Sequence, residues 1–135
     1  MKAAFKFDSF KFPTVSLDFN FPINEGLEII FNPKGKYNVQ IGKYYLTFET
    51  LVQSEETKFN VVKILCEAEF SFMQPLALND IPDFFYPNSL AILFPYIRAF
   101  VSTVSIQANV SPIVLPTLNL TGLKDKLKNN TVVVE

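Results

Sequence analysis

The hydrophobic pattern of this chain changes its period once, near Gln74, and that change decides the fold class. Before Gln74, apolar and polar side chains alternate over long stretches, which is typical of half-buried strands. After Gln74, apolar residues recur every three or four positions from Leu90 to Val104, as they do along one face of a helix. Strands followed by helices in 135 residues predict a single α+β domain, with a sheet in residues 1–73 and a helical region in residues 74–130.

Four strands are expected in the first part of the chain. Each is rich in Val, Ile, Phe or Tyr and is bounded by residues that favour turns; they cover residues 4–18, 27–32, 43–53 and 58–72. Residues 32–36, Asn-Pro-Lys-Gly-Lys, carry Pro and Gly in the positions of a tight reversal, and residues 54–57 form a polar hairpin loop. Strands joined by short connections predict a four-stranded antiparallel meander.

The first strand changes phase twice. Apolar residues hold the odd positions up to Phe7, the even positions over residues 10–12, and the odd positions again from Val15. Because side chains alternate with a period of two, each change moves the apolar set to the other face of the sheet. We therefore expect a bulge near residues 8–9 and a bend near Pro13, whose missing N–H also favours an edge strand.

The apolar helix expected over residues 90–104 contains Pro95. Proline removes a backbone donor and clashes with the carbonyl four residues earlier, so we expect a break in the helix at this position. Residues 110–120 form an extended apolar segment punctuated by two further prolines. Residues 121–129 form at most a short helix, and residues 132–135 either pair as a strand or fray.

Missing residue types exclude most catalytic sites. The chain has no histidine and one cysteine, Cys66, so it cannot build a Ser-His-Asp triad, a His-containing metal site or a cysteine-based zinc site. Its four glycines are scattered singly, so no phosphate-binding loop is present. We expect a protein that is not an enzyme and that uses no cofactor and no metal.

Charge and hydropathy limit the classes of partner that this chain can bind. Twelve basic and 13 acidic residues give a net charge of −1 without a basic stripe, which argues against nucleic acid as a partner. No apolar run approaches the ~20 uninterrupted residues of a membrane span, and Lys6 and Asp8 interrupt any leader-like apolar core, so we expect a cytoplasmic protein without membrane insertion. An apolar content of 49% without a membrane segment then indicates oligomerisation or client binding.

Several motifs resemble those of one chaperone family. Residues 88–98, Asn-Ser-Leu-Ala-Ile-Leu-Phe-Pro-Tyr-Ile-Arg, resemble the Asn-Ile-Leu-Phe-Pro-Tyr-Ala-Arg signature of SecB, the tetrameric bacterial export chaperone. Residues 54–59 resemble the Gly-Glu-Glu-Thr-Ala-Phe hairpin of that family, and residues 70–72, Phe-Ser-Phe, stand where the family has Phe-Ser-Ile. Residues 111–120 resemble its proline-punctuated run. These pieces follow the family's order over most of the chain.

The resemblance to SecB implies both an architecture and a function. The implied fold is α+β, a four-stranded antiparallel sheet with helices packed on one face, assembled as a homotetramer, a dimer of dimers. The implied function is that of a molecular chaperone, a holdase that keeps unfolded preproteins competent for export and passes them to the SecA motor. One branch of the family instead protects an aggregation-prone antitoxin, and the sequence leaves the export and antitoxin roles open.

The resemblance also implies site residues. Family members bind clients in apolar grooves beside the connection from the first to the second strand, and the matching polypeptide-binding positions are Phe19, Phe21, Ile23 and Leu27, with Leu115 and Leu118 as neighbours. Asp18 matches an acidic position that helps to dock SecA. The helical stripe, together with the edge of the first strand, is expected to form the subunit interface through Leu90, Leu93, Ile97, Phe100 and Val104.

Two alternatives stay open. The first places the aromatic residues of segment 19–23 in the core or in a subunit interface instead of against a client. The second makes the protein a carrier of a small molecule or lipid in an internal apolar cavity, which folds built from a sheet and helices can enclose.

Overall fold

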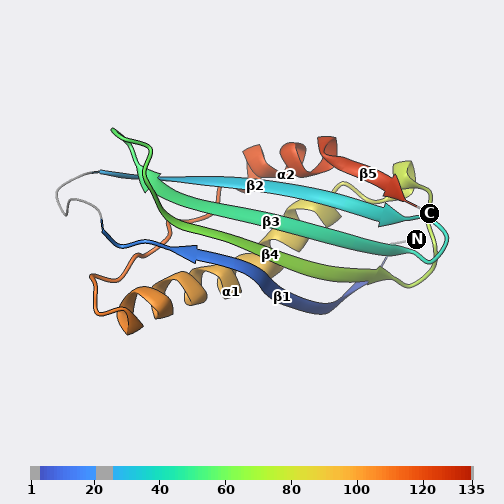
Figure 1. The fold of residues 1–135 in the computed structure, drawn as a ribbon. Helices are drawn as coiled ribbons and strands as arrows, with labels where there is room; N and C mark the ends of the chain where they lie inside the picture. Colours follow the sequence, from blue (N-terminus) through green and yellow to red (C-terminus); the bar gives the residue numbers. More distant parts are fainter. Residues whose placement is uncertain (1–3, 21–25, 135) are drawn as a thin grey trace.

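The computed structural model describes residues 4–20 and 26–134, and its centre is a long five-stranded sheet (Figure 1). The strands are β1 (Phe5–Leu17), β2 (Leu27–Asn38), β3 (Lys43–Ser54), β4 (Asn60–Phe72) and β5 (Thr131–Val134). A short 3-10 helix η1 (Leu78–Asp80) precedes α1 (Phe85–Gln107), and α2 (Leu120–Asn129) leads into β5.

The α+β class is confirmed, but the four-stranded antiparallel meander is wrong in two respects. The strand order is β1-β4-β3-β2-β5, so β1 pairs with β4 and only β2, β3 and β4 follow one another as a meander. The second difference is β5, which pairs in parallel with β2. Because α2 runs beside β2 in the same direction (Figure 1), the residues that follow α2 reach the β2 edge in parallel orientation, and the tail pairs as a strand.

The predicted bulge and bend of β1 are confirmed. Its pairing with β4 shifts register between Phe7 and Ser9 and again between Lys11 and Thr14, at the two places where the sequence pattern changes phase. Pro13 falls inside the second shift, and β1 lies at one edge of the sheet. A residue without an N–H is therefore placed where no ladder hydrogen bond depends on it.

The reversal expected at residues 32–36 is wrong, because β2 continues through Pro33 and pairs with β3 along its whole length. The N–H of Gly35 donates to the carbonyl of Asn130 across the β5 edge, at 3.1 Å. Pro33 lies two residues earlier, so its nitrogen faces the same edge, just beyond the first residue that β5 pairs. Proline is tolerated here because its missing N–H would not have served the β2–β3 ladder.

The true reversal between β2 and β3 lies at residues 39–42. The side-chain oxygen of Asn38 accepts hydrogen bonds from the N–H groups of Gln40 and Ile41, at 3.0 and 3.3 Å. Gly42 has φ +68°, a left-handed conformation that favours glycine. An asparagine followed four residues later by glycine is therefore the turn signal, and the Pro-Gly spacing upstream is not.

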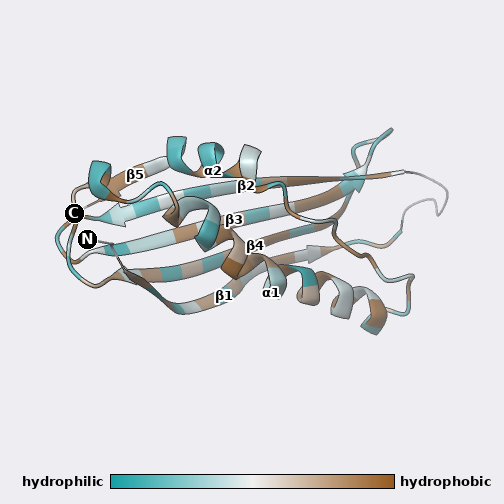
Figure 2. Ribbon diagram, turned by 180° about the vertical axis from the view of Figure 1, so that it is seen from behind, coloured by the Kyte–Doolittle hydropathy of each residue, from teal (hydrophilic) through white to brown (hydrophobic). Residues whose placement is uncertain are grey.

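Helix α1 covers one face of the sheet and lies in front of it in Figure 2. The alternate residues of β3 and β4 that face α1 are buried and form the core. Phe85, at the start of α1, anchors this packing: its ring centroid lies 4.8 Å from that of Tyr44 and 4.9 Å from those of Phe5 and Phe72. Much of the aromatic content of the chain is thus used to join β1, β3, β4 and α1.

Helix α1 runs through Pro95 without interruption, so the expected break is wrong. Proline removes the N–H that would have bonded the carbonyl of Ala91. Both Ala91 and Pro95 are exposed, so the freed carbonyl lies where water reaches it. The cost of the proline is reduced because it falls on the solvent side of the helix.

Helix α1 is also long and apolar enough, by length and composition, to cross a membrane. Its Leu90, Leu93 and Ile97 side chains are fully buried within this chain. These three side chains belong to the hydrophobic core of this chain.

Candidate peptide-binding groove

An apolar groove of about 650 Å³ lies at the end of the sheet where β1 ends and β2 begins. One wall comes from the segment that follows α1, and the rest comes from the strand ends. The lining residues are Phe19, Leu27, Ile29, Val52, Asn109, Val110, Ser111, Pro112, Ile113 and Val114. None of these side chains is charged, so the groove suits an apolar occupant.

The strands place their share of the lining by simple alternation. Ile29 of β2 pairs with Val52 of β3, and both side chains point to the face that carries the helices. Leu27 lies two residues before Ile29 on the same face. Helix α1 ends at Gln107, so residues 109–114, and not the helix, face these strand positions across the groove.

Two serines of α1 hold the opposite wall. The hydroxyl of Ser105 accepts the N–H of Ile113 at 3.0 Å, and the hydroxyl of Ser102 donates to the carbonyl of Ile113 at 3.1 Å. Leu115, two residues further, is fully buried and anchors the segment in the core. Val114 lies between these two attachments and is 62% exposed, so its side chain is presented at the rim of the groove.

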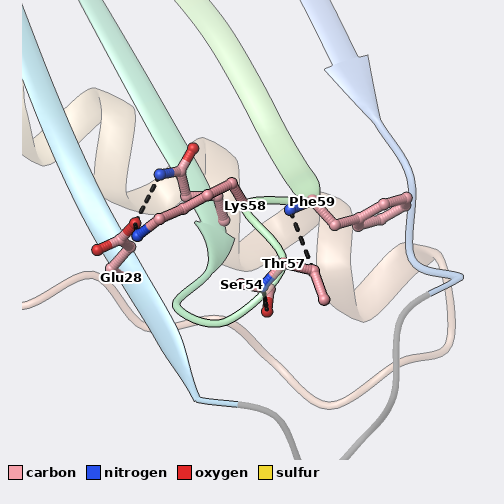
Figure 3. A network of polar contacts seen from close by, with 6 residues as sticks. Glu28, Ser54, Thr57, Lys58 and Phe59 are labelled. Atoms are coloured by element: carbon pink, nitrogen blue, oxygen red, sulfur yellow. Dashed lines mark hydrogen bonds and ion pairs between the residues drawn. The ribbon is translucent and has the colours of Figure 1, made fainter.

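Polar contacts gather on the other face of the sheet beside the groove (Figure 3). Lys58 Nζ lies 2.7 Å from Glu28 Oε1, and Gln53 Nε2 donates to the same oxygen at 2.6 Å. These hydrogen bonds hold the pKa of the Glu28 carboxyl below its usual value, and the bond from Lys58 contributes most. Because Glu28 alternates with Leu27 and Ile29, its charge points away from the groove.

The structure brings some of the predicted polypeptide-binding residues together and separates others. Phe19 and Leu27 line the groove, whereas Phe21 and Ile23 lie outside the described residues. Leu115 is fully buried, so it supports the groove from the core instead of lining it, and Leu118 packs half-buried against the core. The polypeptide-binding role of these residues stays a prediction.

Several lining residues were not predicted from the sequence, among them Ile29, Val52, Val110, Ile113 and Val114. For β2 the signal was present, since Ile29 continues the alternation that begins at Leu27. For the segment after α1, the sequence predicted an extended apolar run, but no pattern indicates which of its side chains meet the strand ends.

Asp18, the predicted docking residue for SecA, is exposed just after β1. Its N–H donates to the carbonyl of Val61 at 2.9 Å, and its carboxylate accepts the N–H of Asn20 at 3.0 Å. The carboxylate therefore shapes the start of the connection from β1 to β2. Docking of SecA stays a prediction.

The residues predicted for the subunit interface divide into two groups. Leu90, Leu93 and Ile97 are fully buried against this chain's own sheet, so they have no exposed surface with which to contact a second subunit in this fold. Phe100 is half-buried and stacks on Phe12 of β1, with ring centroids 4.4 Å apart. Val104 is also half-buried and lies near the end of α1.

No model of a known protein family matches the sequence. An uncharacterized protein of Methanocaldococcus jannaschii, MJ0357, is 29% identical over 100 residues, which are 72% of this chain and 64% of that protein. Among solved structures, the Mycobacterium tuberculosis SecB-like chaperone Rv1957, in complex with a ChAD peptide from the Rv1956 HigA1 antitoxin, superposes with a TM-score of 0.69. That match covers 85% of this chain and 88% of the chaperone at 12% identity. The chain therefore has a SecB-like fold.

Proposed function

We propose that this protein is a SecB-like chaperone, a holdase that binds unfolded polypeptide in the groove between the strand ends and residues 109–114. One observation carries the proposal: the groove has a volume of about 650 Å³, and no described residue of its lining has a charged side chain. The likeness in fold to a SecB-like chaperone that was solved with an antitoxin peptide supports the same function. Binding of this kind needs no catalytic residue, cofactor or metal.

The affinity of such a groove follows from its size and chemistry. Burying one large apolar side chain contributes about 1.5–3 kcal/mol, and ordering a flexible segment opposes this gain. A groove that accepts a few such side chains, without a charge that selects among them, binds many sequences moderately. Moderate and sequence-tolerant binding is what a holdase requires.

The client and the assembly belong to the proposal. Unfolded preproteins destined for export and an aggregation-prone antitoxin both fit an uncharged groove, and SecA docking is proposed only for the export role. A homotetramer is proposed through the β1 edge, where Phe10 and Tyr96 are 37% and 44% exposed with ring centroids 4.4 Å apart. Sedimentation equilibrium measures the assembly directly.

The alternative function, a carrier of a lipid or another small molecule, calls for an enclosed cavity. The groove instead has an exposed Val114 at its rim, which favours a chain that passes along it over a ligand sealed inside it. Native mass spectrometry of the purified protein separates the two functions, because a carrier retains a small molecule of fixed mass.

Suppression of client aggregation tests the proposed function. Light scattering of a slow-folding protein diluted from urea should fall when this protein is present at near-stoichiometric concentration, without nucleotide or metal. Serum albumin at the same concentration controls for crowding. If scattering from several unrelated clients is unchanged by an excess of this protein, the proposed function is wrong.

A further inference from the structure

The outer edge of β2 is only partly paired. Strand β5 covers residues 35–38 of β2 and ends there. The first half of β2, residues 27–31, has β3 on one side and no strand on the other among the described parts of the chain. An unpaired strand edge presents a row of backbone donors and acceptors that another extended chain can join.

The hydrogen bonds of the sheet indicate which backbone groups face this edge. The N–H of Gly35 points outward, to the carbonyl of Asn130, and backbone direction alternates along a strand. The backbone groups of Leu27, Ile29 and Phe31 therefore point outward as well. Lys126 Nζ donates to the carbonyl of Phe31 at 2.9 Å, whereas within residues 4–20 and 26–134 nothing bonds the outward groups of Leu27 and Ile29.

The same two residues line the groove with their side chains. An open backbone edge and an apolar groove thus meet at Leu27 and Ile29. A chain paired with this edge would direct every second side chain towards the face that carries the groove and the others away from it.

We propose that an extended apolar segment of an unfolded protein binds as an added β-strand on residues 27–31 of β2, with alternate side chains in the groove. This inference rests on the proposed function and specifies how the client is held. Main-chain hydrogen bonds supply affinity that does not depend on sequence, and the groove selects for apolar side chains at alternate positions. The β2–β5 ladder, which uses the same edge further along, shows that the edge accepts a strand.

The positive charge of Lys126 lies next to this edge and favours a bound strand with acidic residues. The ammonium group of Lys126 is held by two neutral acceptors, Phe31 O at 2.9 Å and Asn32 Oδ1 at 2.6 Å. No acidic group among the described residues forms an ion pair with it. The added strand should therefore bind more tightly when the end nearest Lys126 carries Asp or Glu, and salt should weaken this gain.

N-methylated peptides test strand addition. The probe is a fluorescent synthetic peptide that alternates Leu and Thr, measured by fluorescence anisotropy. Two versions carry N-methyl groups on every second residue, in opposite phases, so that each removes the N–H groups of one edge only. One phase should lose about tenfold or more in affinity, because it loses its hydrogen bonds to the β2 edge, and the other phase should bind like the parent peptide.

A pair of protein variants tests the same contact from the other side. Ile29→Pro removes one outward N–H without touching the β2–β3 ladder, as the natural Pro33 does in the same strand. It should bind the parent peptide about fivefold or more weakly than the matched Ile29→Val variant, which keeps the N–H.

The possible outcomes separate this inference from the function on which it rests. If the parent peptide binds and both methylated phases bind equally, strand addition is wrong and the groove function stands. If the parent peptide does not bind at all, both are wrong. The peptide experiment decides the question even if Ile29→Pro does not fold.

Discussion

Replacing Val114 by Asp should weaken the binding of unfolded clients at least about tenfold while leaving the fold intact. The side chain lines the groove and is 62% exposed, so the free energy of unfolding should change by no more than about 0.5 kcal/mol. A bound apolar segment, however, would desolvate the new carboxylate without supplying a partner for it, which costs several kcal/mol. Fluorescence anisotropy of an unfolded client measures the affinity, and urea unfolding measures the stability.

The chain offers a matched control for this variant. Ile41 is 57% exposed in the β2–β3 reversal, at the opposite end of the sheet from the groove, so Ile41→Asp adds the same charge at similar exposure. It should bind clients like the original protein. An equal loss of client affinity in the two variants would mean that the added charge acts through general repulsion. If neither variant loses affinity, clients do not bind in the groove.

Replacing Gly35 by Ala should destabilise the protein by about 1–3 kcal/mol and loosen β5 from the sheet. A Cβ at this position would overlap the hydroxyl of Tyr44 and lie 2.8 Å from Thr131 Oγ1. The Tyr44 ring is fully buried against Phe85, so it has no room to withdraw. The hydrogen bond of 2.6 Å between Tyr44 and Thr131, which ties β5 to β3 across β2, should be lost as well.

Gly122 provides the comparison for Gly35. It lies in the first turn of α2, where a Cβ would meet only Asn119 Nδ2, at 3.9 Å. Gly122→Ala should therefore stabilise the protein by about 0.5–1 kcal/mol, because alanine is the better helix former. Urea unfolding of both variants measures the difference, and a Gly35→Ala variant as stable as Gly122→Ala would contradict the packing described for β5.

The local pattern predicted most of the sheet and failed where a distant element decided the outcome. Phase changes in β1 are local, so the bulge and the bend were predicted from sequence. At Pro33 the local signal favoured a turn, but the proline is accommodated because its nitrogen faces an edge that β5 leaves uncovered. The sequence left open whether the tail forms a fifth strand. Whether these four residues pair depends on where α2 ends beside β2, and the local sequence does not show that.

The groove was predicted only in part for a similar reason. Phe19 and Leu27 flank the connection that the resemblance indicated, and both line the groove. Its opposite wall depends on the attachment of Ile113 to Ser102 and Ser105 of α1. These hydrogen bonds join serines of a helix to a segment that follows the helix. Such contacts leave no periodic pattern in the sequence.

The same limit explains the predicted subunit interface. A stripe of Leu90, Leu93 and Ile97 has the same spacing whether it meets a partner or the chain's own sheet. The structure places these three side chains against the sheet of the same chain. Phe100 and Val104 of the same stripe are only half-buried, and the subunit interface itself stays a prediction.

Methyl NMR of the protein titrated with an unfolded client shows directly whether clients bind in the groove. Ile29 and Ile30 are neighbours on opposite faces of β2, so they report the bound face within one experiment. If clients bind in the groove, the methyl resonances of Ile29, Val52 and Val114 should shift, with little change at Ile30. Shifts confined to Ile30, Leu51 and Leu65, which lie on the face of the sheet opposite the helices, would contradict binding in the groove.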